Sequence, residues 1–317
     1  MEWGVRFFFF IKNNNEKYAV ALYPSGTTEI FNSVDDEIDN LPSGCPHIEE
    51  LSESYDNNEY ASTETTNDTL IYNDSTKIND HVRNNIMFVV VSDDVTEVPE
   101  EFRDCKSIKR VVFGENVEDI GSYSFYNCNR LNKIDFSKCK KLSYIGENAF
   151  SKSSILSVKL PDTLNYVDRF AFRECKSLQY AKLPSDILVI EDGLFDGCYA
   201  LDDVTIPSRI KRIGNYAFSE TSISEIELPN TVESLGRFAF YKTKLKSITI
   251  PDSVKYINRK CFADCESLTD VTIPKMSKSM ELYIYETAFA GSPVEETVMQ
   301  EIKDNIFITI EEDEYEW

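Results

Sequence analysis

The amino-acid sequence predicts a repeat solenoid in which each coil contributes one short β-strand and one return segment. Two observations lead to this fold class. After each repeated Phe, apolar residues alternate over a short stretch that in most coils ends at Pro, which is typical of a half-buried strand whose ladder stops where an amide donor is missing. An aliphatic residue also stands five positions before nearly every one of these Phe residues, which recur at Phe102, Phe125, Phe150, Phe172, Phe195, Phe218, Phe240, Phe262 and Phe289. One such unit cannot bury its apolar side alone, so we expect the units to stack.

Residues 1–51 are predicted to form a β-rich N-terminal cap that ends in a degenerate outer coil. A strand over residues 5–11 turns at the run of Asn residues and returns over residues 18–23, as a hairpin would. The segment from Cys45 to Leu51 repeats the spacing of a coil. A separate small domain over residues 1–51 fits the same pattern equally well.

The remaining chain divides into three parts. Residues 52–86 are polar and acidic, which predicts a linker or loop. Residues 87–293 hold eight to nine regular coils. Residues 294–317 are predicted to be a C-terminal cap and an acidic tail, because Val294, Val298 and Ile302 share one helix face and an open solenoid needs its last coil covered.

The residue three positions after each Phe changes together with coil length. Coils with Cys at this position have twelve steps from Phe to the proline position, whereas coils with Ser153, Thr221 or Thr243 have eleven. This indicates two ways of turning into the strand, with Cys as a packed, free thiol and neither a disulfide nor a zinc ligand. The glycines that follow an aliphatic residue are predicted to occupy turns that require positive φ; they are Gly121, Gly146, Gly214 and Gly236.

The outline Ile-x-x-x-Ala-Phe-x-x-Cys-x-x-Leu-x-x-Ile-x-Ile-Pro resembles the BspA-like, or Treponema-type, leucine-rich repeat family over about residues 88–293. The resemblance implies an α/β leucine-rich repeat solenoid that is right-handed and curved. Short parallel β-strands would line its concave side, and irregular or short helical segments would return the chain. It also implies protein binding and adhesion, cell-surface or secreted localisation, and no catalytic residues.

Composition and sparse catalytic side chains exclude several function classes. A formal charge of −22 disfavours nucleic acid and anionic lipid partners. No stretch approaches the ~20 apolar residues of a membrane helix, and the apolar N-terminal run lacks the features of a signal peptide, which favours a cytoplasmic protein. The two histidines, His47 and His81, have no Cys or Ser at nucleophile spacing. We therefore expect no enzyme and no cofactor.

The outward side chains of the concave strands are the candidate partner-binding residues. The first four strands are net basic and the middle strands acidic, with a change of sign near residues 180–205. This pattern predicts a monomer that binds a protein ligand of complementary polarity, with Leu156 and Tyr180 as apolar anchors. The candidate residues are Lys109, Arg110, Lys133, Leu156, Lys159, Tyr180, Lys182, Asp203, Glu225 and Glu227. Two alternatives stay open: a merely solvated sheet, or a regulatory or small enzymatic function in an N-terminal segment that the solenoid displays.

Overall fold

The chain forms two units, residues 1–60 and residues 61–317. The computed structural model describes residues 6–11, 17–22, 28–31, 65–66, 68–274, 282–304 and 308–311. In the first unit β1 (Arg6–Ile11) pairs antiparallel with β2 (Lys17–Leu22), and Phe10 lies opposite Tyr18. The predicted hairpin is confirmed, and β3 (Thr28–Phe31) adds a third strand beside β2. The degenerate coil predicted at residues 45–51 lies outside the described residues.

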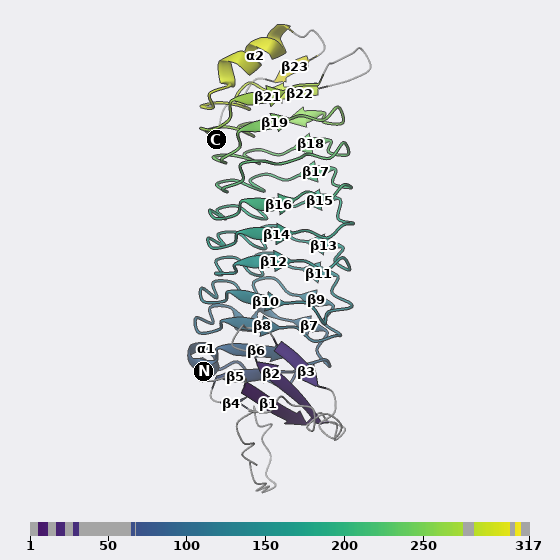
Figure 1. The fold of residues 1–317 in the computed structure, drawn as a ribbon, viewed down its shortest axis with the longest axis vertical. Helices are drawn as coiled ribbons and strands as arrows, with labels where there is room; N and C mark the ends of the chain where they lie inside the picture. The colour runs from purple at the N-terminus through teal and green to yellow at the C-terminus, as the bar shows by residue number, and fades with distance from the viewer. Residues whose placement is uncertain are drawn as a thin grey trace, which may run out of the picture. The chain divides into compact units, whose positions relative to one another are not determined.

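The second unit is a stack of coils, and nearly every coil has a short strand at the position that the alternation predicts (Figure 1). Residues 223–229 have the same alternation, but the strand predicted there does not form. Parallel pairing between successive coils confirms the solenoid, which has about nine turns. We call the surface of these strands the long-strand face. Its strands are β5 (Thr69–Tyr72), β6 (Phe88–Val91), β8 (Arg110–Val112), β10 (Lys133–Asp135), β12 (Ser157–Lys159), β14 (Tyr180–Lys182), β16 (Asp203–Thr205), β19 (Ser247–Thr249) and β21 (Asp270–Thr272).

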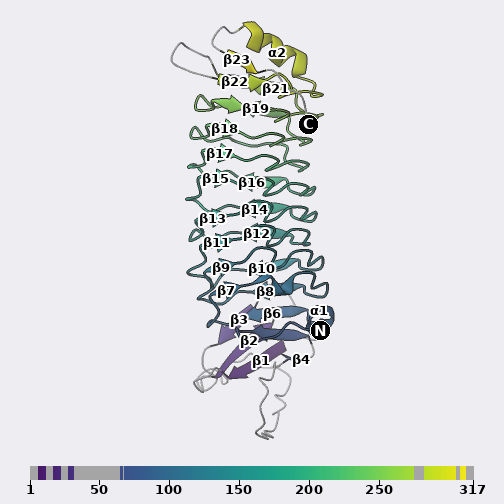
Figure 2. The ribbon, with the colours of Figure 1, turned by 180° about the vertical axis from the view of Figure 1, so that it is seen from behind.

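Each return segment also carries a strand, which the sequence pattern did not predict. These strands form a second parallel surface, the short-strand face (Figure 2). The aliphatic residue five positions before Phe is the inward residue of each two-residue strand, as Ile145 and Ile190 show by their complete burial. The strands are β7 (Glu97–Val98), β9 (Asp119–Ile120), β11 (Tyr144–Ile145), β13 (Tyr166–Val167), β15 (Val189–Ile190), β17 (Arg212–Ile213), β18 (Ser234–Leu235), β20 (Tyr256–Ile257), β22 (Leu282–Tyr285) and β23 (Ile308–Glu311).

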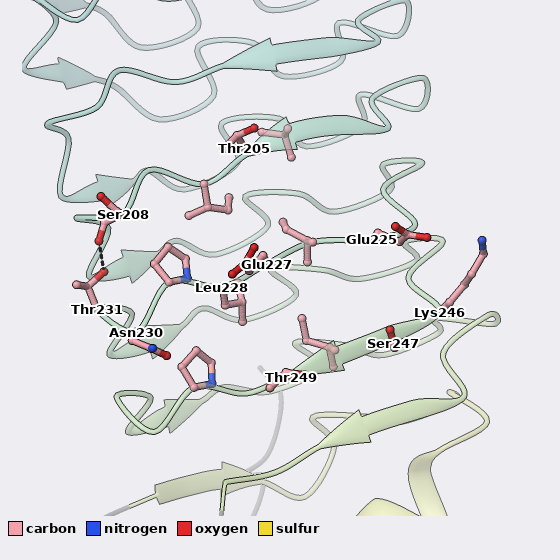
Figure 3. A pocket seen from close by; sticks show the side chains of 16 residues that line it. Thr205, Ser208, Glu225, Glu227, Leu228, Asn230, Thr231, Lys246, Ser247 and Thr249 are labelled. Carbon is pink, nitrogen blue, oxygen red and sulfur yellow. Dashed lines mark hydrogen bonds between the residues drawn. The ribbon is translucent and has the colours of Figure 1, made fainter.

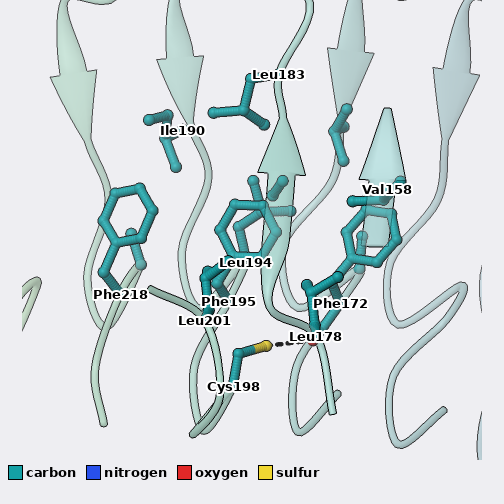
Figure 4. Close-up of a cluster of buried hydrophobic side chains, with 14 of the residues drawn as sticks. Val158, Phe172, Leu178, Leu183, Ile190, Leu194, Phe195, Cys198, Leu201 and Phe218 are labelled. Carbon is teal, nitrogen blue, oxygen red and sulfur yellow. Dashed lines mark hydrogen bonds between the residues drawn. The ribbon is translucent and has the colours of Figure 1, made fainter. Parts of the chain in front are cut away.

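The repeated Phe residues form a continuous buried column between the two faces (Figure 4). The rings of Phe125 and Phe150 stack at 5.4 Å and 2°. The backbones of these two coils are also joined, because the Phe125 amide donates to the Ala149 carbonyl at 2.7 Å. Ala149 is completely buried at this junction, which accounts for the small residue that precedes most of the Phe residues. Ring stacking and backbone bonding therefore join each coil to the next.

Cysteine side chains lie in the interior, and several of them donate to the carbonyl of the repeated Phe in the coil before. The Cys198 thiol donates to the Phe172 carbonyl at 3.1 Å (Figure 4), and Cys128 and Cys175 make the equivalent bonds. In a shorter coil, Thr221 instead donates to the Phe218 carbonyl of its own coil at 2.9 Å. The seven described cysteines are free and buried, as predicted; Cys45 lies outside the described residues.

The two coil lengths decide where the long-strand sheet is continuous. Every strand of a twelve-step coil pairs with the strand before it, as β10 does with β8 and β14 with β12. In the described residues, no ladder joins the strand segment of an eleven-step coil to the coil before it: β12 does not pair with β10, and residues 224–228 pair with neither β16 nor β19. The short-strand sheet stays paired behind the second interruption, through β15, β17, β18 and β20. The short-strand face is interrupted at a different place, between β13 and β15, so coil length marks the interruptions of the long-strand sheet alone.

The predicted linker over residues 52–86 is wrong for its second part. The strand β5 pairs parallel with β6, and α1 (Asp80–Asn85) follows it, capped by the Asn79 side chain. Leu70, Val82 and Ile86 are buried in the common core. These few apolar residues are placed at coil positions, which the polar composition of the segment concealed. Among the earlier residues, β4 (Thr65–Thr66) pairs antiparallel with β5, and residues 52–64 lie outside the described part.

The glycine prediction is also wrong. Gly121, Gly146, Gly214 and Gly236 do not have positive φ, which occurs instead at Gly193, Gly197 and Gly291. A Cβ on Gly236 would lie 2.5 Å from the Gly214 backbone carbon. The absence of a side chain therefore serves the close approach of neighbouring coils.

A helix and a strand follow the last regular coil, where the sequence predicts a C-terminal cap. The helix α2 (Glu295–Asp304) buries Val298 and Ile302, and Val294 is buried just before it. The strand β23 continues the short-strand sheet beside β22. The acidic tail at residues 312–317 lies outside the described residues.

Candidate binding surface

The long-strand face, predicted to be concave, holds the ten candidate residues. Apart from Arg110, all are exposed or half-buried. The parallel register places Lys133 beside Arg110, Lys182 beside Lys159, and Asp203 beside Tyr180. The structure therefore arranges most of the predicted residues in rows across successive coils. In those rows the sign of charge changes from β14 to β16.

Arg110 departs from the expectation that it projects into solvent. Its side chain is 7% exposed, and it forms an ion pair with Asp135 at 2.8 Å. Burial raises the pKa of Asp135, but hydrogen bonds from Ser137 and Arg110 more than offset this and hold the pKa below its usual value. Arg110 is therefore a structural residue that joins β8 to β10. It lies beside the candidate surface and is not a contact residue of it.

Lys159 and Lys182 carry an unfavourable arrangement of like charges. They occupy directly paired positions of β12 and β14, and both are exposed. In the described part of the chain, neither forms an ion pair with an acidic side chain. Like charges opposite each other on neighbouring strands destabilise a sheet. An anionic group of a partner would relieve this repulsion.

The acidic part of the face also holds exposed charges that are not part of ion pairs, here negative ones. Asp203 on β16 and the alternate residues Glu225 and Glu227 are exposed, and Asp202 lies beside them. Within the described ranges, none of these carboxylates is part of an ion pair. The face thus presents two uncompensated regions, one basic and one acidic.

Elsewhere on the coils, some charged side chains form ion pairs with each other. Across the arcs and the short-strand face, Arg169 bonds Glu147 at 2.9 Å and Arg212 bonds Glu191 at 2.9 Å. Among the described residues, the Arg110–Asp135 pair is the only ion pair between strand residues of the long-strand face. The exposed charges of this face are therefore not compensated by ion pairs among its described strand residues.

Two apolar side chains stand at the basic region. Leu156, just before β12, is 51% exposed, and Tyr180 on β14 is half-buried. Leu156 follows the first interruption of the sheet, between β10 and β12. Apolar and aromatic groups surrounded by charge are suited to anchoring a protein partner.

A groove of about 1190 Å³ opens at the second interruption of the sheet (Figure 3). It is lined by residues 204–206 and 208 of the β16 coil, by residues 225–231, and by residues 246–249 and 251 of the β19 coil. The half-buried side chains of Val204 and Ile226 contribute apolar surface, while Glu225 and Glu227 contribute acidic groups. The sequence pattern predicted these two glutamates as outward residues but not the groove or its apolar residues Ile226 and Leu228. A sequence signal for the groove exists, because Thr221 and Thr243 mark two successive eleven-step coils.

The buried thiols beneath this surface are poorly suited to act as nucleophiles. Burial raises the pKa of Cys105 to about 11 and that of Cys175 to about 12. A thiol that keeps its proton is a poor nucleophile. No group of His, Cys, Asp and Glu side chains suited to a metal ion occurs among the described residues.

Comparison with protein families identifies the repeat. The family model of the BspA-type leucine-rich repeat region matches residues 76–202 and 189–310, with six copies. This match covers more than half of the chain. The chain belongs to the BspA-type leucine-rich repeat family. The predicted resemblance is confirmed, while no curated protein matches the chain.

Solved structures of leucine-rich repeat proteins are similar to this BspA-type chain. One from Bacteroides ovatus has 24% identity and a TM-score of 0.48; the match covers 63% of this chain and 59% of that one, so the chain spans less than two thirds of its length. A leucine-rich cell surface protein from Faecalibacterium prausnitzii has 19% identity and a TM-score of 0.36, covering 97% and 95%. The leucine-rich repeat protein of T. pallidum has 20% identity and a TM-score of 0.37, covering 74% and 86%.

In the part of this BspA-type chain that the structure describes, no helix combines the length and the apolar character that crossing a membrane requires.

Proposed function

We propose that this protein is a non-catalytic, adhesin-like binding scaffold at the cell surface or outside the cell, and that the long-strand face contacts a protein ligand. The observation that carries the proposal is the exposed Lys159–Lys182 pair, which repeats one charge across two paired strands and has no acidic partner among the residues that the structure describes. Such an arrangement costs stability in the isolated solenoid. Exposed Leu156 lies beside it, so charge and apolar contact are available together.

The ligand would carry an acidic group against β12 and β14 and basic groups against β16 and residues 225–227. Opposite polarity along one face favours a single orientation of the partner. Surface charges contribute mainly to encounter rate and specificity. Affinity would come from apolar anchoring at Leu156 and Tyr180.

The test compares partner capture by three full-length baits. The Lys159→Glu/Lys182→Glu variant reverses the basic region, whereas Lys211→Glu/Lys255→Glu reverses two exposed lysines on the other side of the coils, each near Glu233. We expect the wild-type chain and the control to capture the same protein, and the first variant to capture at least about tenfold less, a loss of 1.4 kcal/mol. Higher salt should weaken capture. Equal capture by all three baits would contradict the proposal.

A further inference from the structure

The groove between β16 and β19 differs from the rest of the long-strand face in its backbone. Residues 224–228 run between two strands without forming a ladder with either of them. Behind them, β17 pairs with both β15 and β18. On the side of the groove (Figure 3), the Lys246 amide donates to the Ser224 carbonyl at 3.1 Å, but no ladder joins residues 225–228 to the neighbouring coils in the described part of the chain.

The charged side chains around the groove favour a ligand of positive charge. Glu225 and Glu227 are alternate residues of the extended segment, so their side chains leave the backbone on the same side. Both are exposed, and Lys246 is the single basic residue among those that line the groove. Asp202 and Asp203 add two exposed carboxylates on the neighbouring coil. The local excess of acid favours a cationic occupant.

The spacing of Glu225 and Glu227 favours a peptide ligand in an extended conformation. Alternate side chains of an extended peptide point to one side and lie about 6.6 Å apart, the same repeat as that from Glu225 to Glu227. Lysine or arginine at alternate positions would therefore meet both carboxylates at once, in charge-assisted hydrogen bonds. The backbone of such a peptide can bond to the unpaired segment, as in recognition by strand addition.

We infer that this groove binds an extended segment of a partner protein that carries Lys or Arg at alternate positions, with Glu225 and Glu227 as the residues that recognise the cations. The inference rests on the proposed function and names the partner chemistry at one part of the same face. The groove is associated in the sequence with two successive eleven-step coils, which Thr221 and Thr243 mark.

The test measures fluorescence anisotropy of labelled peptides with the full-length protein. The probe alternates Lys and Thr; one comparison peptide alternates Glu and Thr, and the other has the probe's composition with its lysines consecutive. We expect the alternating Lys peptide to bind most tightly. Equal binding of the two Lys peptides would show attraction without register and would overturn the inference.

Two variants separate recognition by charge from access to the groove. Glu225→Gln/Glu227→Gln removes both charges at nearly constant shape, and Thr205→Trp fills the groove from an exposed position of β16. Each variant should lower the affinity for the alternating Lys peptide at least about tenfold. The control Glu118→Gln/Glu266→Gln removes two exposed charges outside the groove and should bind as the wild type does. Unchanged binding in both groove variants would overturn the inference.

The outcome is distinguishable from failure of the proposed function. Lys159 and Lys182 lie outside the groove lining. If their reversal abolishes partner capture while the groove variants bind peptide normally, the inference fails and the proposed function stands. If the groove variants lose the peptide while partner capture is insensitive to Lys159 and Lys182, the inference stands and the basic region is not the contact.

Discussion

At the scale of single residues, the position three residues after each Phe varies together with coil length. A Cys there bonds the preceding coil, as Cys198 bonds the Phe172 carbonyl, whereas Thr221 bonds within its own coil. The sequence predicted two kinds of turn and inward thiols, because residue type and coil length vary together. It did not predict that the shorter turn interrupts a sheet, since pairing between coils depends on the register of both.

The buried thiols predict how stability depends on pH. Unfolding exposes Cys175, whose pKa then returns from about 12 to its ordinary value of 9.0. The folded state therefore keeps a proton that the unfolded state releases, and the free energy of unfolding falls as pH rises from 9 toward 12. At pH 10 this thiol should lower the free energy of unfolding by about 1.4 kcal/mol. Urea unfolding at pH 8 and pH 10 should show a smaller decrease for Cys175→Ser than for the wild type; identical decreases would contradict the assignment.

The glycines between coils predict a contrast between two substitutions. Gly236→Ala would place Cβ 2.5 Å from the Gly214 backbone, whereas in Gly121→Ala the nearest atom is the Val98 carbonyl oxygen at 3.1 Å. Overpacking against backbone costs about 1–3 kcal/mol, so Gly236→Ala should lower the melting temperature clearly more than Gly121→Ala. Equal melting temperatures for the two variants would refute the role given to close coil approach.

At the scale of elements, the sequence predicted the three-residue strands but not the two-residue strands. Alternation of apolar residues followed by Pro marks a strand such as β14. A two-residue strand such as β13 has a single inward residue, Val167, and so contains no alternation to detect. The groove escaped prediction for a related reason: it is made by the absence of pairing around residues 224–228, which no local pattern reports.

The interrupted ladder predicts uneven hydrogen exchange. Amides of residues 225–228 have no ladder with either neighbouring strand, whereas residues 180–182 of β14 are paired on both sides. Because exchange requires opening of hydrogen bonds, we expect peptides that cover residues 225–228 to exchange faster than those that cover residues 180–182. Similar protection of the two segments would show that the sheet is continuous there.

At the scale of the whole molecule, the solenoid needs its last coil covered. The helix α2 buries Val298 and Ile302, and β23 extends the sheet beyond β22. A chain that ends at residue 294 would expose apolar surface and an unpaired strand edge. We expect it to self-associate in sedimentation velocity, while a chain that ends at residue 311 and lacks only the acidic tail stays monomeric. A monomeric 1–294 chain would contradict the capping role.

The central claim is that a protein ligand contacts the long-strand face. It is tested most directly by a photo-crosslinking residue placed either at Leu156 on that face or at Leu188, beside β15 of the short-strand face. These are matched sites, because the two leucines are 51% and 44% exposed. We predict that the captured partner is crosslinked from position 156 and not from position 188. Crosslinking from position 188 alone, or equally from both, would contradict the account.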